Sequence, residues 1–387
     1  MPIAKILLFI LFFCSNVKNT RNFIVFLHTL ITNYILTYFL SESEKKMKLF
    51  MPERVFFESS ALSYPLGREL YEKFSSEGLD IIKAPMQKVS SFIPGTTDVE
   101  KYSSGKRTLV VAVKKSLKFD VCRPSADFEF SLATGCPGNC EYCYLYTTQT
   151  SKPYIRTYVN IDEIFDSVKE HIKKNNGLTT FEVASAGDPL AIEHLTGSLA
   201  KTIEFFGTLE NAKLRVVTKF DYVDPLLPLK HNGRTRFRFS INSRYVIDNF
   251  EHTTANLDER IEAASKIASA GYPLGFIVAP IMIYDGWQQE YMELFKKMSE
   301  NIDTSKTAEP VTFELIQYRF TPTAKNFIQE RFPKTKLDMD EATRTLKWGK
   351  FGRFKYVYPK ETSADIKDYI TGLIAEYLPN ARVDYFT

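Results

Sequence analysis

Three cysteines stand close together in the sequence, at Cys136, Cys140 and Cys143, in a stretch that also contains two glycines. A structural zinc site usually takes four ligands in two separated pairs, and this sequence has no second pair. Three thiolates can instead hold a 4Fe–4S cluster and leave one iron open to a chelating substrate. The spacing therefore favours an iron–sulfur cluster. The alternatives are three buried cysteines, or a zinc site completed by one of the five histidines.

The cysteine count indicates a reducing compartment. Only Cys14 and Cys122 lie outside the group of three, and five cysteines in 387 residues are too few and too bunched for a disulfide framework. The chain is 44% hydrophobic and 25% charged, which excludes a chain that is disordered over most of its length. Its length predicts roughly two or three domains, or one barrel-sized domain with smaller parts attached.

The net charge by itself gives little support for nucleic-acid binding. The formal charge is +4, and residues 1–46 contribute five basic but only two acidic side chains to it. The rest of the chain is close to neutral, so any contact with nucleic acid must come from local clusters of charge.

Residues 1–46 differ in kind from the rest of the chain. The apolar run Ile6–Cys14 is too short for a bilayer-spanning helix, which needs about 20 residues, and polar residues interrupt the stretch Phe23–Leu40. A lysine before the first run is typical of a secretory signal, but no small-residue cleavage site follows it. We interpret the segment as translated upstream sequence, with Met47 or Met51 as the true start. A membrane anchor is the alternative.

From about residue 107 onward, short β-rich runs alternate with amphipathic helical patterns. Ile164, Val168 and Ile172 recur at helical spacing and predict a helix over Ile161–Lys174. Similar patterns predict the helices Leu195–Leu209, Leu257–Ala270 and Gln288–Ser299 and the strands Thr179–Ala184, Leu214–Thr218, Arg236–Ile241, Leu274–Ala279 and Val311–Leu315. Strands that alternate with helices predict a parallel sheet with crossover helices, as an α/β barrel or an open α/β sheet.

In such a barrel the chemistry takes place at the carboxyl ends of the strands. The residues that follow the predicted strands are Ser185–Asp188, Lys219, Ser240–Ser243, Ala279–Pro280 and Gln317–Arg319. We expect the functional side chains that work with the three cysteines to be among them.

The spacing C-x3-C-x2-C, with an aromatic residue before the last cysteine, resembles the signature of the radical S-adenosylmethionine superfamily. That resemblance implies that the cofactor chelates the open iron and is cleaved by one electron to a 5′-deoxyadenosyl radical. Longer stretches are more specific, and they resemble the spore photoproduct lyase family from about Met51 to Thr387. These stretches are Thr134–Tyr144, Ser151–Asn160, His231–Asn242, Phe313–Gln317 and Lys347–Gly349.

The family resemblance implies an α/β protein: a partial (β/α) TIM-type barrel of the radical S-adenosylmethionine kind, with smaller N- and C-terminal parts and a β-hairpin that wedges into DNA. It implies a DNA-repair lyase that returns 5-thyminyl-5,6-dihydrothymine, the ultraviolet lesion of spore DNA, to two thymines. The implied cofactors are a 4Fe–4S cluster and S-adenosyl-L-methionine. The implied partners are double-stranded DNA that carries the lesion and an electron donor such as flavodoxin or ferredoxin. No stable membrane partner is expected, and the expected location is the cytoplasm of the spore or germinating cell.

The resemblance also implies roles for individual residues. The cluster ligands would be Cys136, Cys140 and Cys143. The positions implied to bind S-adenosylmethionine are Tyr142, Asp188, Lys219 and Ser240, for which capping or packing is the alternative. Tyr144 matches a tyrosine proposed in the family to relay a hydrogen atom. Gly187 stands where the family often has a serine near the cofactor, so one hydrogen bond to the cofactor would be missing.

One departure from the family concerns the hydrogen donor. The usual donor is a cysteine on the strand Phe-Glu-x-x-Cys, where this sequence has Ser185. A serine O–H bond is far stronger than an allylic C–H bond, so Ser185 cannot return hydrogen to the thymine allyl radical, whereas a thiol can. Cys122 is the remaining thiol, fourteen residues before Cys136. We hypothesise that Cys122 is the donor, with Tyr142 or Tyr144 as its partner. An incidental buried cysteine is the alternative.

Residues 344–356 interleave cations with aromatic rings, as expected of a protein that opens a duplex. A lesion inside the base stack must be extruded before a radical can reach it. This stretch resembles the family's wedging hairpin, and the implied DNA contacts are Trp348, Lys350 and Phe351. A solvated amphipathic hairpin is the alternative. We expect a second basic group to be merely an exposed face, namely Lys114, Lys115, Lys118 and Arg123.

We divide the chain into four parts: a hydrophobic extension at residues 1–46, an N-terminal region at 47–125, the partial barrel at 126–320, and a C-terminal region with hairpin and terminal helix at 321–387. Two other functions are open at this point. One is a radical S-adenosylmethionine enzyme of the same ancestry with another substrate, and the other is an iron–sulfur or zinc protein that binds nucleic acid without catalysis. Cleavage of S-adenosylmethionine would separate the enzymes from the binding protein.

Overall fold

The computed structural model describes residues 49–85, 88–149, 152–175, 177–183, 185–348 and 354–387, and it leaves out the side chains of residues 146 and 148. The chain divides into two compact units, residues 1–48 and 49–387. The predictions for residues 1–46 therefore lie outside the described residues. No helix in the described ranges combines the length and apolarity that a membrane span requires.

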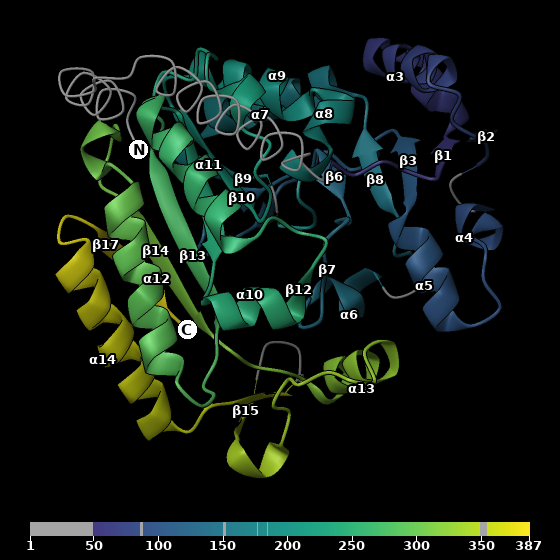
Figure 1. The fold of residues 1–387 in the computed structure, drawn as a ribbon. Helices are drawn as coiled ribbons and strands as arrows, with labels where there is room; N and C mark the ends of the chain where they lie inside the picture. The colour runs from purple at the N-terminus through teal and green to yellow at the C-terminus, as the bar shows by residue number, and fades with distance from the viewer. Residues whose placement is uncertain (1–48, 86–87, 150–151, 176, 184, 349–353) are drawn as a thin grey trace, which may run out of the picture. The chain divides into compact units, whose positions relative to one another are not determined.

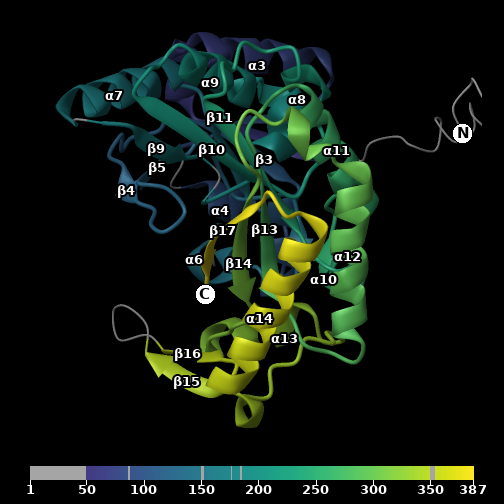
Figure 2. The same ribbon diagram turned by 90° about the vertical axis from the view of Figure 1, so that its left-hand side faces the viewer.

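A curled eight-stranded sheet forms the centre of the second unit (Figures 1 and 2). Its order is β17-β14-β13-β11-β10-β9-β5-β4, and all neighbours are parallel except β4 and β5. The strands are β4 (Asp120–Val121), β5 (Phe128–Glu129), β9 (Thr179–Glu182), β10 (Ala212–Thr218), β11 (Thr235–Ile241), β13 (Leu274–Ile281), β14 (Thr312–Gln317) and β17 (Arg382–Phe386). This curled sheet confirms the predicted α/β class and partial barrel.

Helices cover the outer face of this sheet (Figure 1). They are α7 (Ile161–Lys174), α8 (Glu193–Thr196), α9 (Ser198–Gly207), α10 (Arg244–Phe250), α11 (Leu257–Ser269), α12 (Trp287–Asn301) and α14 (Lys360–Tyr377). Strand alternation explains the two faces. On β11, Phe237 and Phe239 are fully buried in the apolar core that the helices share, whereas Arg238 and Ser240 point to the opposite, inner face. The inner face is therefore polar and available for chemistry.

A second sheet with its own apolar core lies on the N-terminal side. Its order is β2-β1-β3-β8-β6, and β6 is antiparallel to β8. The strands are β1 (Arg54–Phe57), β2 (Ile81–Lys83), β3 (Thr108–Ala112), β6 (Ala133–Thr134) and β8 (Ile155–Tyr158), with helices α3 (Pro65–Ser76), α4 (Val89–Phe92) and α5 (Asp98–Lys106). Because β4 joins the large sheet while β8 joins this one, the two sheets interleave along the chain, and the proposed domain boundaries stay a prediction.

Several short elements gather at the end of the unit to which the large sheet's strands point (Figures 1 and 2). They are β7 (Asn139–Cys140), α6 (Leu145–Gln149), β12 (Glu251–His252), α13 (Pro322–Arg331), and the hairpin β15 (Thr345–Trp348) and β16 (Phe354–Val357). Strands β15 and β16 pair antiparallel, so the predicted hairpin is present, although residues 349–353 between its strands lie outside the described part.

The elements predicted from residue 161 onward match the structure with two differences, and the elements before residue 107 were not predicted. The helix Ile161–Lys174 has the predicted bounds. The single helix predicted over Leu195–Leu209 is wrong: α8 ends and α9 begins at Gly197, whose φ of 59° is left-handed and breaks the helical path. The edge strand β17 was not predicted at all.

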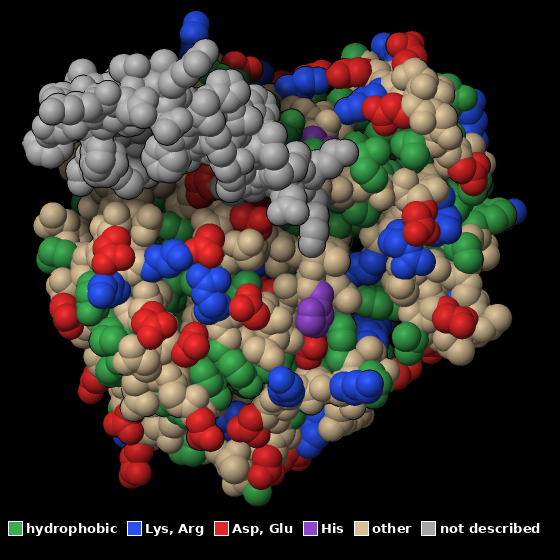
Figure 3. Space-filling view, viewed as in Figure 1, with side chains coloured by type: hydrophobic (Ala, Val, Ile, Leu, Met, Phe, Trp, Pro, Cys, Tyr) green, Lys and Arg blue, Asp and Glu red, His purple; other side chains and the backbone are tan. Residues whose placement is uncertain are grey.

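The outer helices present a mixed-charge surface (Figure 3). Acidic and basic side chains alternate there and pair with one another, as Asp258 does with Arg244 and Lys297. This is the pattern of a solvated face, in contrast to the buried polar side chains on the inner face of the sheet.

Candidate active site

The loop that carries the three cysteines is tied to the rest of the fold through its backbone. Strand β7 pairs antiparallel with β12, which sets Cys140 opposite Glu251. The Glu141 amide donates to the Phe250 carbonyl at 2.9 Å. The Thr253 hydroxyl donates to the Pro137 carbonyl at 2.9 Å. Residues 250–253, far along the chain, therefore fix the shape of the cysteine loop.

A lysine side chain supports the same loop from the other side. The Lys106 ammonium donates to the carbonyls of Cys136 and Gly138, at 2.7 and 2.9 Å. Burial alone would lower the pKa of Lys106, but Tyr102 and the three nearby cysteines outweigh it and raise the pKa. This places a positive charge beneath the cysteine loop.

Cys140 is buried, and Cys136 and Cys143 are half-buried. Burial raises the pKa of Cys140 to about 12 and raises that of Cys136 still further, and the neighbouring cysteines add to both shifts. Within the part of the chain that the structure describes, no three His, Cys, Asp or Glu side chains converge as the ligands of one metal ion do.

Four side chains form a buried polar cluster next to Cys140: Tyr142, Lys219, Glu251 and Arg260. The Lys219 ammonium donates to the Tyr142 hydroxyl at 2.5 Å and to Glu251 Oε1 at 2.7 Å. The Tyr142 hydroxyl also donates to Glu251, and Arg260 Nη2 donates to Glu251 Oε2 at 2.6 Å. Burial would raise the pKa of Glu251, but Arg260 and Lys219 outweigh it and lower the pKa to about 2. The carboxylate is therefore charged and holds both cations in place.

Two further predicted residues lie beside this cluster. Arg260 Nη1 donates to the Ser240 carbonyl at 3.0 Å, which joins the end of β11 to the cluster. Asp188 accepts from the Thr218 hydroxyl at 2.9 Å and from the Lys219 amide at 3.0 Å. Burial raises the pKa of Asp188 to about 6 in spite of these bonds. Because the Asp188 carboxylate accepts hydrogen bonds from Thr218 and from the Lys219 amide, Asp188 holds the backbone of Lys219 in place.

The loop of Asp188 touches the cysteine loop directly. Gly135 and Gly187 form an isolated parallel bridge, and the Gly135 amide donates to the Ala186 carbonyl at 2.9 Å. A Cβ atom at Gly187 would lie only 2.6 Å from the Gly135 carbonyl oxygen. Gly187 is thus required for this close approach in the present backbone.

Tyr144, Ser185 and Cys122 lie around the same loops. The Tyr144 hydroxyl donates to the Ser185 carbonyl, while the Ser185 hydroxyl is buried without a hydrogen-bond partner among the described residues. Partial burial and then the nearby Cys143, Glu129 and Cys122 groups raise the pKa of Tyr144. The Tyr142 hydroxyl, in contrast, is engaged in the polar cluster.

The predicted DNA contacts are only partly described. Trp348 is 71% exposed at the end of β15, and its ring meets that of Phe354 edge to face at a centroid distance of 5.9 Å. Lys350 and Phe351 lie outside the described residues. Leu346, on the same strand as Trp348, is also exposed.

Sequence reasoning missed Lys106, Glu251 and Arg260. None of the three belongs to a motif, and each reaches its partner from a separate element. Glu251 and Arg260 lie near each other in the sequence. Helix α11, which contains Arg260, was predicted only from the spacing of its apolar residues, so its charged residues were not considered. The signal that would have found Arg260 is a charged side chain on the buried side of that helix.

The comparison with known proteins decides the family. The family model described as spore photoproduct lyase matches residues 50–387. The chain belongs to the spore photoproduct lyase family. Spore photoproduct lyase of Geobacillus sp. is 50% identical over 342 residues, which cover 88% of this chain and 100% of that protein. Spore photoproduct lyase of Bacillus subtilis is 49% identical over 339 residues, covering 87% of this chain and 99% of that protein.

Solved structures of the spore photoproduct lyase family have the same fold. Spore photoproduct lyase complexed with dinucleoside spore photoproduct has a TM-score of 0.85 at 50% identity, and covers 88% of this chain and 100% of the solved one. A variant with bound AdoMet and dinucleoside spore photoproduct has a TM-score of 0.84 with the same coverage and identity. The family resemblance predicted from the sequence is thus confirmed over the whole second unit.

Proposed function

We propose that this chain is a DNA-repair lyase that returns the spore photoproduct, 5-thyminyl-5,6-dihydrothymine, to two thymines by a radical mechanism. Support comes from the relatives, which are spore photoproduct lyases, one of them complexed with the dinucleoside lesion. The observation that carries the proposal is the buried cluster of Tyr142, Lys219 and Glu251 beside Cys140, in a chain 50% identical to the complexed protein.

Cys136, Cys140 and Cys143 would hold a 4Fe–4S cluster. Their burial raises the pKa of Cys136 and Cys140, so these two thiolates need a cationic partner, which cluster iron provides. The three thiolates would each bind a different iron of the cluster. When bound, the cluster and S-adenosylmethionine would supply a reducing electron and a 5′-deoxyadenosyl radical that takes the C6 hydrogen of the lesion.

Lys219, Tyr142 and Ser240 would bind S-adenosylmethionine, with Asp188 holding the backbone of Lys219. Lys219 directly follows β10 and Ser240 lies near the end of β11, where barrel enzymes place their substrates. The Lys219 ammonium suits the cofactor's carboxylate, and the Tyr142 hydroxyl, which accepts a hydrogen bond from Lys219, helps to orient that ammonium. The family member solved with bound AdoMet supports S-adenosylmethionine as the cofactor.

Cys122 would return the hydrogen atom. Burial and a hydrogen bond with Glu129 raise the pKa of Cys122 to about 12, so at neutral pH it carries the S–H bond that a hydrogen-atom donor needs. The S–H bond breaks as the methyl C–H bond of thymine forms, and a thiyl radical remains. Tyr144 would quench that radical with its phenolic hydrogen and regain a hydrogen atom from the deoxyadenosine formed earlier. Tyr142 is less suited, because its hydroxyl is held between Lys219 and Glu251.

The β15–β16 hairpin would open the duplex with Trp348, Lys350 and Phe351. The exposed indole of Trp348 at the end of β15 supports this role, since base stacking needs a free aromatic face. The substrate would be double-stranded DNA with the thymine lesion. The electron would come from a carrier such as flavodoxin or ferredoxin, which places the reaction in the reducing cytoplasm of a spore or germinating cell.

The experiment uses the full chain with a reconstituted cluster, dithionite, S-adenosylmethionine and a synthetic spore-photoproduct dinucleotide. We expect release of thymidine dinucleotide, which is measured by chromatography. Cofactor cleavage without any repair would contradict the proposal and favour an enzyme with another substrate. Ser185, which stands where the family has its donor cysteine, is the reason to consider that alternative. Absence of 5′-deoxyadenosine would favour a protein that only binds nucleic acid.

A further inference from the structure

The loop that carries Cys122 needs an anchor. It joins β4 and β5, two strands of only two residues each at the edge of the large sheet. Two backbone bonds close the loop: the Cys122 amide donates to the Asp127 carbonyl, and the Ala126 amide donates to the Cys122 carbonyl, both at 3.2 Å. Such a short edge hairpin is marginally stable alone. Its position must come from contacts with the rest of the barrel.

The first anchor joins Asp127 to Thr180 on β9. Asp127 Oδ2 accepts from the Thr180 hydroxyl at 2.8 Å and from the Thr180 amide at 3.0 Å. The Asp127 amide donates back to the Thr180 hydroxyl at 3.0 Å. These bonds lower the pKa of Asp127 although burial would raise it. Asp127 is therefore charged near neutrality and fastens one end of the loop to β9.

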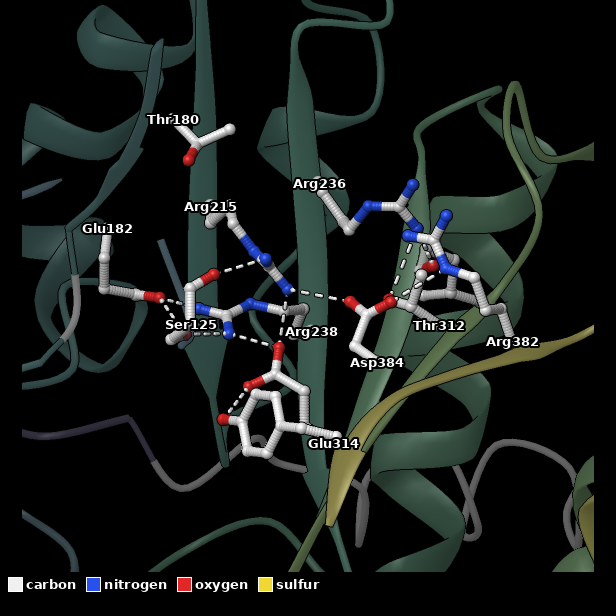
Figure 4. Close-up of polar contacts among 12 residues, drawn as sticks. Ser125, Thr180, Glu182, Arg215, Arg236, Arg238, Thr312, Glu314, Arg382 and Asp384 are labelled. Atoms are coloured by element: carbon white, nitrogen blue, oxygen red, sulfur yellow. Dashed lines mark hydrogen bonds and ion pairs between the residues drawn. The ribbon is translucent and has the colours of Figure 1, made fainter. Parts of the chain in front are cut away.

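The second anchor is Ser125, which lies among Arg215, Arg238 and Glu182 (Figure 4). The Ser125 hydroxyl accepts from Arg238 Nη1 at 2.6 Å and donates to Glu182 Oε2 at 3.3 Å. The Ser125 carbonyl accepts from Arg215 Nη1. One residue of the loop thus contacts side chains of three neighbouring strands, β9, β10 and β11.

These side chains belong to a buried ion network on the inner face of the sheet. Arg238 pairs with Glu182 and with Glu314 on β14, whose Oε1 lies 2.6 Å from Arg238 Nη1. Arg215 Nη2 also lies 2.6 Å from Glu314. Arg238 and Glu314 are each 1% exposed. A Cβ at Gly275 would lie 3.1 Å from Arg238 Cγ, so this glycine leaves the room that the arginine stem occupies.

The network lies next to the proposed cofactor positions. Along β11, Arg238 precedes Ser240 by two residues, so both side chains point to the same face of the sheet. Arg215 lies on the neighbouring strand β10, and Lys219 directly follows the last residue of that strand, Thr218. The network therefore fixes the Cys122 loop to the strands whose carboxyl ends carry Lys219 and Ser240.

We propose that Ser125 and Thr180 are positioning residues for hydrogen return, because they hold the Cys122 loop against the inner face of the barrel. This inference rests on the proposed donor role of Cys122. Transfer of a hydrogen atom from sulfur to carbon requires the two atoms to be within contact distance. A loop that shifts by about 1 Å loses this geometry, and such a misplacement can reduce a rate by about 100-fold. The allyl radical then survives to be quenched by other hydrogen donors or by the reductant.

The test measures how the radical is partitioned. Full-length Ser125→Ala and Thr180→Val are assayed with the lesion dinucleotide, and thymidine dinucleotide is compared with misquenched products for each 5′-deoxyadenosine formed. We expect the misquenched fraction to rise by about tenfold in both variants while cofactor cleavage is retained. We expect the Ser125→Ala variant to fold, because Arg238 keeps its ion pairs with Glu182 and Glu314.

Tyr385→Phe is the matched control. The Tyr385 hydroxyl donates to Glu314 Oε2 at 2.5 Å, so its loss weakens the same network without touching the Cys122 loop. A merely structural role for Ser125 predicts that Ser125→Ala and Tyr385→Phe behave alike. The positioning role predicts that Tyr385→Phe partitions the radical as the wild type does.

A second measurement needs neither cofactor nor substrate. The rate at which iodoacetamide alkylates Cys122 is followed by peptide mass spectrometry in the wild type, Ser125→Ala, Thr180→Val and Tyr385→Phe. Release of the loop predicts faster alkylation in the first two variants only. Unchanged alkylation and unchanged partitioning would overturn the inference. Faster alkylation in Ser125→Ala and Thr180→Val, together with a wild type that repairs no lesion, would uphold the anchor and contradict the proposed function instead.

Discussion

Arg260 and Glu251 form an ion pair in which Nη2 lies 2.6 Å from Oε2 and both side chains are fully buried. The second oxygen of the same carboxylate binds Lys219, so one acidic group holds two cations beside Cys140. Buried pairs of this kind contribute little net stability, but loss of one partner leaves an uncompensated charge. We therefore interpret Glu251 as the residue that organises the cofactor side of the site.

Glu251→Ala should lower the free energy of unfolding by about 3–5 kcal/mol, because Arg260 would remain charged without its partner. Urea denaturation monitored by circular dichroism measures this loss. Asp258→Ala is the control: Asp258 pairs with Arg244 at 3.0 Å, but both side chains are about half exposed, so its loss should cost less than about 1 kcal/mol. Equal losses in the two variants would contradict the assignment.

Asp188→Asn should remove one pH-dependent contribution to stability. The folded chain binds the Asp188 proton more tightly than the unfolded chain, because its pKa is about 6 instead of the usual 3.8. This contribution is complete below pH 3.8 and is lost as the pH rises through about 6, and it amounts to about 3 kcal/mol. Unfolding free energies of the cluster-free chain between these pH values should fall more steeply in the wild type than in Asp188→Asn. Parallel profiles would show that Asp188 is not the group involved.

Lys106→Met should lower the reduction potential of the reconstituted cluster. Reduction adds negative charge, and the buried Lys106 ammonium, bound to the carbonyls of Cys136 and Gly138, stabilises that charge. A redox titration followed by electron paramagnetic resonance measures the shift. Lys101→Met, an exposed position on the same helix, should leave the potential unchanged. A potential that does not respond to Lys106 would assign this residue to loop structure alone.

Trp348→Ala should weaken binding to a lesion-bearing duplex by about tenfold, since stacking on an aromatic side chain contributes about 1–3 kcal/mol per base. Fluorescence anisotropy with a labelled duplex measures this affinity. Repair of the isolated dinucleotide should be unaffected, because no duplex has to be opened. Leu346→Ala, exposed on the same strand, is the control. If both variants bind the duplex as the wild type does, the hairpin does not contact DNA through this residue.

The sequence was most informative where local periodicity determines structure. Ile164, Val168 and Ile172 sufficed to predict α7, and the apolar runs predicted the central strands to within a few residues. The split of α8 from α9 depends on the left-handed backbone of Gly197. A glycine can also lie inside a continuous helix, so the apolar spacing alone did not predict this break. Strand β17 could not be predicted, because its short polar-alternating sequence is a strand only through its pairing with β14.

The site followed a similar division. The cysteines and Lys219 belong to recognisable patterns, whereas Ser125 and Arg238 meet across 113 positions of the chain. Such contacts depend on the curl of the sheet and on which face each strand residue takes. The pairing of β7 with β12, which brings Glu251 opposite Cys140, has the same origin. Long-range supporting residues therefore emerge only from the fold.

The most direct measurement of the central claim is the origin of the hydrogen that returns to thymine. The full chain, with reconstituted cluster and S-adenosylmethionine, repairs the lesion dinucleotide in D2O, where the Cys122 thiol exchanges its proton for deuterium. We predict deuterium in the methyl group of the released thymine for the wild type, and loss of this labelled product in Cys122→Ala. Labelled thymine from Cys122→Ala in the wild-type proportion, or no thymine release from either protein, would contradict the account.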